Sequence, residues 1–382
     1  MQTQLYAWHA ENGDIVDFAG FQMPVMYTSI IEEHMAVRNA VGLFDVSHMG
    51  RMWIQGKDSE KFLNALVPRD LSKTNIGRAS YTFMLNELGG FRDDLVFERI
   101  EENKWLLVWN AGNYEKILHW IKLLSVLIND FSKLEIEIIN ISPSSAMYAL
   151  QGPKAEAVLK RVIPENASPP SSWNILQTTI GSCDVIVSGT GYTGESGYEI
   201  IVFNTSNEEN TNAVNVWMKL LVEGKQFNIK PCGLGARDSL RLEAGYHLYG
   251  NDISESINPL EADLFFPPFI HINKSSFIGK PQLEILKEKP LQKIRVGLIS
   301  MKRGPSPRSG LKLFQGEKEI GVISSGGFSP ILNIGIGMGY ILPEYNIENE
   351  IIQFQVRNKM HEVKIQKYPL YDPDMYGKSR KD

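Results

Sequence analysis

Two adjacent carboxylates are the most unusual chemical feature of the sequence. Asp93 and Asp94 follow a Gly-Gly pair in the stretch "MLNELGGFRDDLVFERI" and lead into an apolar run typical of a strand. Consecutive side chains of a strand face opposite sides, so one aspartate is expected to point inward and the other outward, without forming a paired site. Burial of the inward carboxylate would raise its pKa or demand a cationic partner. A plain turn after the glycines is the alternative, and the turn preference of aspartate favours it.

A glycine-rich segment offers a second candidate site. The stretch "SGTGYTGESGYEI", residues 188–200, contains a GxGxxG spacing between Gly189 and Gly194. A dinucleotide-binding loop of this kind needs a strand before it and a helix after it. Here "CDVIVS" precedes the glycines and "GYEIIVF" follows them, and both have the composition of strands. The pattern therefore predicts a hairpin loop, and dinucleotide binding is disfavoured.

The stretch "FDVSHMG", residues 44–50, contains the three residue types of a hydrolytic triad. Asp45, Ser47 and His48 lie too close in sequence to make both hydrogen bonds of a triad, which is normally assembled from distant segments. The sequence also lacks a GxSxG elbow. We expect the aspartate and the serine to bind the backbone locally.

A third group of polar residues lies in "PCGLGARDSLRLEAG", which is typical of a glycine-rich entry into a helix. Arg237 falls in the first turns of this helix, and Arg241, four residues later, shares its face. A guanidinium group suits bidentate binding of a carboxylate or an oxo group. An intramolecular salt bridge is the alternative, and it is the commoner role of a single arginine.

Composition limits the classes of protein to consider. The 382 residues predict two or three domains. Lysine and arginine number 39 against 44 acidic residues, and no basic block dominates any segment, so nucleic-acid binding is not expected. No signal peptide and no apolar run of about 20 residues is present, so we expect a cytoplasmic protein without a membrane span. Cys183 and Cys232 lack zinc-ligand spacing; they suit a reducing compartment, although the sequence leaves a disulfide open.

The elements that must position these residues divide the chain into two parts. Helical periodicity and capping signals predict helices over residues 29–42, 113–126 and 211–224, separated by strand-like runs. After residue 290 short strands alternate with Gly, Pro and Asn turns, as in a small barrel. The predicted class is therefore α+β, with two interleaved α+β subdomains over residues 1–280 and an antiparallel β-barrel over residues 290–375.

Taken in order, these motifs resemble one known family. "FDVSHMG", "GGFRDDL", "LQGPKA", "GTGYTGESGYE", "GLGARDSLRLEAG" with "YGND", and "SSGGFSPIL" with "GMGY" occur as in the aminomethyltransferase of the glycine cleavage system, the T-protein family. The resemblance extends over essentially the whole chain. It implies a cloverleaf of three domains around a central opening that holds tetrahydrofolate, the last domain being a β-barrel.

The resemblance also implies roles for individual residues. Asp94, the second aspartate of "DDL", would be the functional carboxylate beside the reacting nitrogens of the pterin. Glu199 would bind donors on the pterin ring, Tyr192 would line the same pocket, and Arg237 would meet the polar end of the folate. Four further positions match the family's folate pocket: Met49, Tyr81, Val96 and Asn110.

The implied reaction suits these residue types. Members of the family transfer an aminomethyl carbon from the lipoyl arm of H-protein to tetrahydrofolate, which is an acceptor substrate, and release ammonia. The reaction passes through a cationic, iminium-like species, which a fixed carboxylate such as Asp94 can stabilise while it orients the folate amine. A proton transfer by the same carboxylate remains open. No metal, flavin or nicotinamide is required.

Some segments depart from the family pattern. "FFPPFIHINKSSFIGK", residues 265–280, has Pro267 and Pro268 where a strand is usual, and Arg92 and Glu98 are uncommon choices. These departures leave room for another tetrahydrofolate-dependent transferase of the same fold, such as a demethylase that needs no H-protein. A non-catalytic relative that assists iron–sulfur cluster assembly is disfavoured, because the chain lacks the cysteine signature of that group and retains "DDL".

Overall fold

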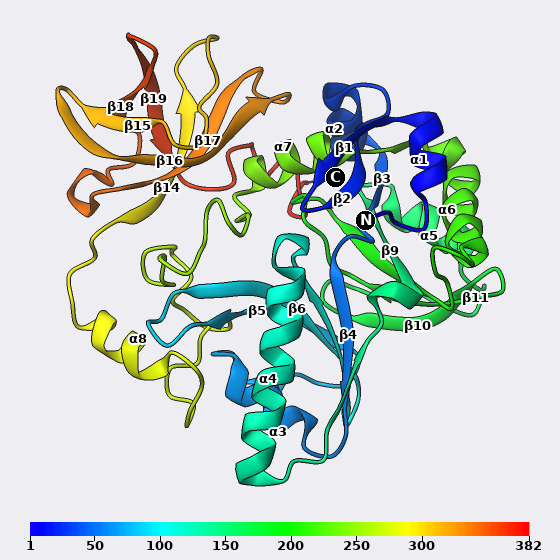
Figure 1. Ribbon diagram of the computed structural model, residues 1–382. Coiled ribbons are helices and arrows are strands. Elements are labelled where there is room, and N and C mark those ends of the chain that lie inside the picture. Colours follow the sequence, from blue (N-terminus) through cyan, green and yellow to red (C-terminus); the bar gives the residue numbers. More distant parts are fainter. Residues whose placement is uncertain (382) are drawn as a thin grey trace. The chain divides into compact units, whose positions relative to one another are not determined.

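The protein, shown as a computed structural model, consists of two compact units (Figure 1). The structure describes residues 1–381, and of residues 129–132 only the backbone. The first unit contains residues 1–84, 93–191 and 195–237, and the second contains residues 85–92, 192–194 and 238–382. Each unit is described by itself below. Their elements confirm the α+β class.

One sheet of the first unit carries the two aspartates. Its strand order is β5-β6-β7-β4-β8. The strands are β4 (Gly50–Gln55), β5 (Arg78–Leu85), β6 (Phe91–Glu101), β7 (Lys104–Trp109) and β8 (Glu137–Asn140). Helix α4 (Tyr114–Ser132) lies along this sheet (Figure 1) and buries Ile117, Ile121 and Leu124, which recur at helical spacing. The short helix α3 (Ser59–Leu66) buries Phe62 and Leu63 in the same unit.

A second sheet has the order β10-β11-β12-β9-β3-β13. Its strands are β3 (Val41–Asp45), β9 (Ser145–Gln151), β10 (Ile175–Ile180), β11 (Cys183–Ser188), β12 (Gly197–Phe203) and β13 (Ile229–Pro231). Helices α5 (Ala155–Val162) and α6 (Thr211–Gly224) share a hydrophobic core with it, in which Trp217 and Tyr148 are fully buried. Strands β11 and β12 form the hairpin that the sequence predicts around the glycine-rich segment.

The N-terminal elements complete the first unit. They are α1 (Tyr6–Asn12), α2 (Ile30–Asn39) and the hairpin of β1 (Asp14–Phe18) with β2 (Phe21–Met26). The Ser29 hydroxyl caps α2 by accepting a bond from the backbone N–H of Glu32, as predicted. The predicted end of this helix at Gly42 is wrong. The helix ends at Asn39, and Gly42 lies inside β3, where a Cβ would come 2.4 Å from Val37 and 2.7 Å from the Cys232 sulfur. Sheet pairing thus overrides helix periodicity here.

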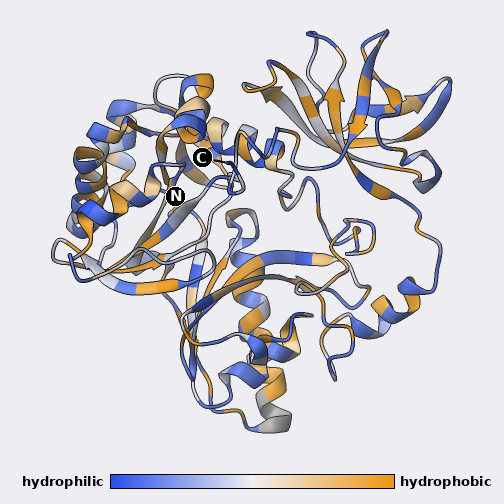
Figure 2. Cartoon of the chain, turned by 180° about the vertical axis from the view of Figure 1, so that it is seen from behind, coloured by the Kyte–Doolittle hydropathy of each residue, from blue (hydrophilic) through white to orange (hydrophobic). Residues whose placement is uncertain are grey.

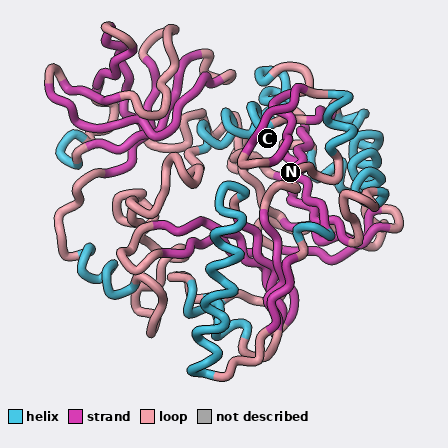
Figure 3. The backbone as a smooth tube through the Cα atoms, viewed as in Figure 1, coloured by secondary structure: helices cyan, strands magenta, loops and turns pink. Residues whose placement is uncertain are grey.

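The second unit contains a closed barrel with the strand order β14-β17-β16-β15-β18-β19. The strands are β14 (Ile294–Ser300), β15 (Lys312–Gln315), β16 (Lys318–Ser329), β17 (Ile334–Ile341), β18 (Ile351–Val356) and β19 (Lys359–Gln366), and loops join them (Figure 3). Hydrophobic and hydrophilic residues alternate along these strands (Figure 2). Ile352 and Phe354 are fully buried, whereas Gln355 is exposed, as the alternation predicts. The C-terminal antiparallel barrel is confirmed.

Helix α7 (Leu234–Ala244) begins in the first unit and continues into the second, which also contains α8 (Lys280–Lys287). Pro267 and Pro268 lie in a turn. Short 3₁₀ helices occur at Leu71–Lys73, Ala111–Asn113, Ser142–Ser144, Lys225–Phe227 and Pro343–Tyr345. Both cysteines are buried and free, so they form no disulfide. Among the described helices, none is long and apolar enough to cross a membrane.

Candidate functional site

The carboxylate of Asp94 is held by two neighbouring strands. The Tyr81 hydroxyl, on β5, donates to Oδ2 of Asp94 at 3.1 Å, and the Asn110 amide, which follows β7, donates to Oδ1 at 2.7 Å. Asp94 itself lies on β6 and is half-buried. Because each oxygen accepts a bond from a different residue, the plane of the carboxylate is fixed, while Asp94 stays partly exposed.

The register of the sheet places a fourth predicted residue in the same row. Trp109 of β7 pairs with Leu95 of β6 and with Gly50 of β4. One residue further along, these pairings bring Asn110 opposite both Asp94 and Met49. Asp94, Asn110 and Met49 therefore lie in one row across the sheet, and the Tyr81 hydroxyl reaches Asp94 at the end of this row from β5. Four residues that the sequence places far apart are gathered at one end of the five-stranded sheet.

Asp93 confirms that one aspartate points inward and the other outward, and it contradicts the favoured expectation of a turn. It lies inside β6 rather than in a turn, and its side chain is fully buried. Although it faces the opposite side from Asp94, its Oδ1 accepts from the same Asn110 amide nitrogen at 2.9 Å. The expectation that the aspartates share no site is therefore wrong: a side chain from the neighbouring strand joins both carboxylates. Strand alternation predicts only the directions of the Cβ atoms. It does not predict that one side chain, here Asn110, binds carboxylates on both faces of the strand.

Both aspartates have raised pKa values. Burial is the main cause for each, and the neighbouring charge of Asp94 raises the pKa of Asp93 further. Hydrogen bonds from Tyr81 and Asn110 partly oppose this shift for Asp94 because they stabilise its ionised form. In its ionised form, the Asp94 carboxylate can stabilise a developing positive charge. Because burial raises its pKa, it can also take up and release a proton.

Val96 and Glu98 follow Asp94 on the same face of β6, because alternate residues of a strand share a face. Glu98 is only 2% exposed, and its Oε1 accepts a hydrogen bond from the Ser188 hydroxyl on β11. Ser188 pairs directly with Glu199 of β12. The face that begins at Asp94 thus ends, roughly 13 Å further along the strand, beside the hairpin that carries Glu199.

Glu199 and Glu98 differ in their surroundings. Glu199 is half-buried, and its Oε2 accepts from the Thr190 hydroxyl at 2.6 Å. Burial, together with the nearby negative charge of Glu199, raises the pKa of Glu98 to about 7. One carboxyl is thus accessible to a ligand, and the other is close to half-protonated at neutral pH.

The segment that carries Met49 is fixed by a buried arginine. Arg51 of β4 donates to the backbone oxygens of Ser47 and Met49 at 3.0 and 2.6 Å. Asp45 accepts the backbone N–H of Ser47 at 2.8 Å, so the aspartate binds locally as expected. Ser47 instead bonds to the carbonyl and amide of Met147, and no hydrolytic triad forms among Asp45, Ser47 and His48.

Arg237 lies near the Met49 end of the row. It occupies the first turn of α7, where the sequence places it. Burial lowers the pKa of His48 to about 3, and the positive charges of Arg237 and Arg51 contribute to this shift. Since His48 directly precedes Met49, the Arg237 guanidinium adds positive potential at this end of the row. Arg241, by contrast, forms a buried salt bridge to Asp252 at 2.6 Å, the structural role that the sequence left open.

Tyr192 belongs to the second unit. Its hydroxyl donates to the carbonyl of His247, and its ring stacks on that of Tyr246 with centroids 5.7 Å apart. The neighbouring glycines form the bend between β11 and β12, so the GxGxxG segment is not followed by a helix. A role of Tyr192 in lining a folate pocket stays a prediction.

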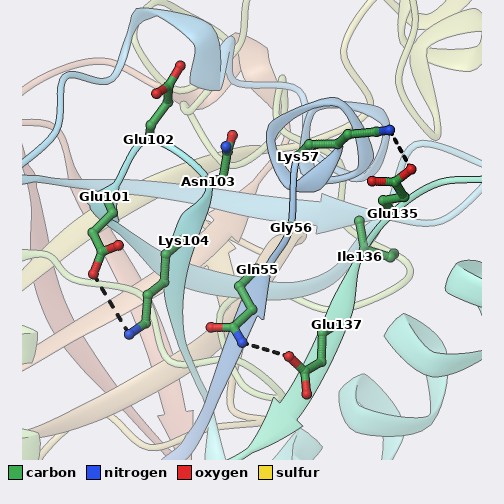
Figure 4. A pocket seen from close by; sticks show the side chains of 10 residues that line it. All are labelled: Gln55, Gly56, Lys57, Glu101, Glu102, Asn103, Lys104, Glu135, Ile136 and Glu137. Carbon is green, nitrogen blue, oxygen red and sulfur yellow. Dashed lines mark hydrogen bonds and ion pairs between the residues drawn. The ribbon is translucent and has the colours of Figure 1, made fainter.

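A surface groove of about 660 Å³ lies at the opposite end of the five-stranded sheet (Figure 4). It is lined by the end of β4, the start of β7 and the start of β8, and by none of the predicted site residues. Its carboxylates are largely matched: Glu101 lies 3.9 Å from Lys104, Glu135 pairs with Lys57, and Glu137 accepts from Gln55 at 2.6 Å (Figure 4). This arrangement resembles a solvated, charge-balanced surface rather than a reaction site.

Two residues of this region were not selected from the sequence as site residues. In the sequence Glu98 stands out only as an uncommon choice, although its spacing of four from Asp94 on a strand places both on one face. The sequence does not mark Arg51 either. Its role is to bind backbone carbonyls, and this depends on the path of the segment around Met49, which no sequence pattern shows. Among the described residues, no cluster of three or more His, Cys, Asp or Glu could hold a metal ion.

An α+β portion followed by a closed barrel is also the architecture of a solved aminomethyltransferase. The GCVT N-terminal domain model matches residues 5–274, and the glycine cleavage T-protein C-terminal barrel domain model matches residues 293–372. The chain therefore belongs to the glycine cleavage T-protein family. The resemblance read from the sequence is confirmed, and the chain is a transferase of this family.

Curated relatives extend over nearly the whole chain. An aminomethyltransferase of Caldanaerobacter subterraneus subsp. tengcongensis is 43% identical over 360 residues, covering 94% of this chain and 92% of the relative. A probable aminomethyltransferase of Pyrococcus horikoshii is 37% identical, covering 98% of each chain. The crystal structure of glycine cleavage system aminomethyltransferase T from Bartonella henselae is similar with a TM-score of 0.87 and 32% identity, covering 99% of each chain.

Proposed function

We propose that the chain is the aminomethyltransferase of the glycine cleavage system and that Asp94 is its catalytic carboxylate. The observation that carries the assignment of the residue is the fixation of Asp94 by Tyr81 and Asn110 on an accessible face of the sheet. Family membership supports the reaction class. The acceptor substrate is tetrahydrofolate, and the donor is the aminomethyl group on the lipoyl arm of H-protein.

In the proposed reaction, the carbon leaves both sulfur and nitrogen of the donor. Its bonds to the lipoyl sulfur and to ammonia break, and bonds to N5 and N10 of tetrahydrofolate form. The two protons displaced from these nitrogens leave with the ammonia and the dihydrolipoyl thiol, so the products are 5,10-methylenetetrahydrofolate, ammonia and dihydrolipoyl H-protein. The carbon passes through a cationic, iminium-like species, and the negative charge of Asp94 stabilises it.

The other predicted residues would bind the acceptor. Glu199 offers a carboxylate to adjacent donors on the pterin ring, an arrangement that gives a strong bidentate contact. Met49 and Val96 would contact the faces of the ring system, with Tyr81 and Asn110 holding Asp94. Arg237 would attract the polar end of the folate, and Tyr192 would line the same pocket. We place the reaction in the cytoplasm, with H-protein as a transient partner.

The decisive experiment mixes the protein with tetrahydrofolate and aminomethylated H-protein and follows ammonia and 5,10-methylenetetrahydrofolate. Both products should appear together, and Asp94→Asn should abolish most of the rate. Ammonia release no faster than from H-protein alone would reject the proposal. A rate that persists without H-protein, with a methylated amine or sulfonium compound as donor, would instead indicate a demethylase of the same fold.

A further inference from the structure

Glu98 is a buried carboxyl to which the proposed reaction gives no role. It lies on β6, on the same face as Asp94 and Val96, and only 2% of it is exposed. The Ser188 hydroxyl binds its Oε1, while its Oε2 has no hydrogen-bond partner in the described part of the chain. A buried polar atom without a partner is costly, and such atoms are uncommon in folded proteins. An oxygen left in this state is ready to accept a donor from a ligand.

The position of Glu98 indicates which ligand would supply that donor. Ser188 is the cross-strand partner of Glu199, so Ser188 connects the two glutamates, and the charge of Glu199 acts directly on Glu98. Two carboxyls that lie together repel each other unless hydrogen-bond donors are placed between them. An exocyclic amino group carries two N–H donors that diverge from one nitrogen. It can therefore serve one carboxyl with each hydrogen.

We propose that Glu98 is a specificity-determining residue that accepts a hydrogen bond from the 2-amino group of the pterin, beside Glu199. The inference rests on the proposed function, since it assumes that a pterin lies along the face from Asp94 to Glu199. Ser188 occupies Oε1, so Oε2 is the oxygen left for the ligand. The site then selects heterocycles that carry an amino group at this edge.

The test compares two ligands on three proteins. The ligands are tetrahydrofolate and an analogue in which a methyl group replaces the 2-amino group. The proteins are the parent, Glu98→Met, which removes both acceptors at similar length, and Glu98→Gln, which keeps a carbonyl oxygen. Glu101→Gln is the matched control, since Glu101 lies on the same strand but is exposed. Dissociation constants are measured for each pair, and kcat and KM for transfer to tetrahydrofolate.

Glu98→Met should weaken tetrahydrofolate binding about 10- to 100-fold, the loss expected for one hydrogen bond to a carboxyl, and leave binding of the analogue nearly unchanged. KM should rise with kcat little altered. Glu98→Gln should restore most of the discrimination between the two ligands, and Glu101→Gln should match the parent.

Three outcomes would overturn the inference, and only the last of them would also reject the proposed function. Equal weakening of both ligands by Glu98→Met would assign Glu98 a purely structural role, and unchanged binding of both ligands would assign it none. In either case the proposed function would stand, provided that the parent protein transfers the aminomethyl carbon to tetrahydrofolate. Failure of the parent itself to bind tetrahydrofolate would reject the proposed function and this inference together.

Discussion

The side-chain amide of Asn110 donates to Asp94 at 2.7 Å, and the same nitrogen lies 2.9 Å from the buried Asp93. One amide thus holds an accessible carboxylate and ties it to a second one inside the sheet. The backbone N–H of Asn110 also donates to Asp93 at 3.3 Å, which fixes the asparagine itself. The buried Asp93 therefore supports the side chain that orients the half-buried Asp94.

The two aspartates should differ in their effects. Asp94→Asn should retain the fold and most tetrahydrofolate affinity but lower kcat at least 100-fold, because the charge that stabilises the cationic intermediate is lost. Asp93→Asn should be milder in transfer, its main effect being a lower melting temperature from the disturbed contact with Asn110. Single-turnover rates and thermal unfolding separate the two effects. Equal loss of transfer in both variants would contradict the assigned roles.

Asn110→Ala should change the pH dependence of transfer. The Asn110 hydrogen bond stabilises the ionised form of Asp94 and so lowers its pKa, against the larger effect of burial. Without that bond the pKa of Asp94 rises, and if the ionised form is active, the acid limb of the kcat profile moves to higher pH. The measurement is kcat between pH 5 and 9 for both proteins. An unshifted acid limb with reduced kcat would show that Asn110 acts on geometry alone.

Glu98 should make the protein less stable as pH rises. Its pKa is raised by burial to about 7, so between pH 4.5 and 7 the folded state binds more protons than the unfolded state. The stabilisation is therefore fully present below the unfolded pKa and is lost as pH rises through 7, by about 3 kcal/mol at most. Glu98→Gln should gain stability relative to the parent between pH 5 and 8, measured by urea unfolding. A constant difference would contradict this linkage.

The sequence predicts elements better than contacts between them. Helix α4 and the barrel strands carry a clear periodicity of burial, so their existence follows from local pattern. The end of α2 does not follow from local pattern, because pairing of Val41–Asp45 with β9 and β13 extends the strand back to Val41. The contact of Glu98 with Ser188 joins residues 90 positions apart, and only the packing of two sheets creates it. Asp93 was assigned to a turn for the same reason: its burial depends on neighbouring strands.

Arg51 should be essential for stability. Its guanidinium is fully buried and donates to backbone oxygens of Ser47, Met49, Ser142 and Ser145. A lysine cannot reproduce this fork of donors, so Arg51→Lys should lower the free energy of unfolding by about 3 kcal/mol or more. Arg78→Lys is the control, since Arg78 is exposed and its replacement should cost less than about 0.5 kcal/mol. Similar urea midpoints for both variants would refute the prediction.

The two cysteines should differ in reactivity. Burial raises the pKa of both thiols, so neither should react quickly in the folded protein. Cys183 lies at the turn end of the hairpin formed by β11 and the edge strand β10, where local opening is easiest. Cys232 is packed against Gly42 inside the unit. Labelling with a maleimide, followed by peptide mapping, should modify Cys183 first and Cys232 only upon global unfolding; the reverse order would contradict this.

The barrel closes because its first strand, β14, pairs with its last, β19. The final seam therefore depends on a strand made late in synthesis, Lys359–Gln366. A chain truncated before residue 359 would expose the free edges of both β14 and β18, each a template for pairing with another molecule. Loss of a few C-terminal residues beyond β19 should therefore change only the local order of the chain end. Loss of β19 itself should open the barrel and promote aggregation.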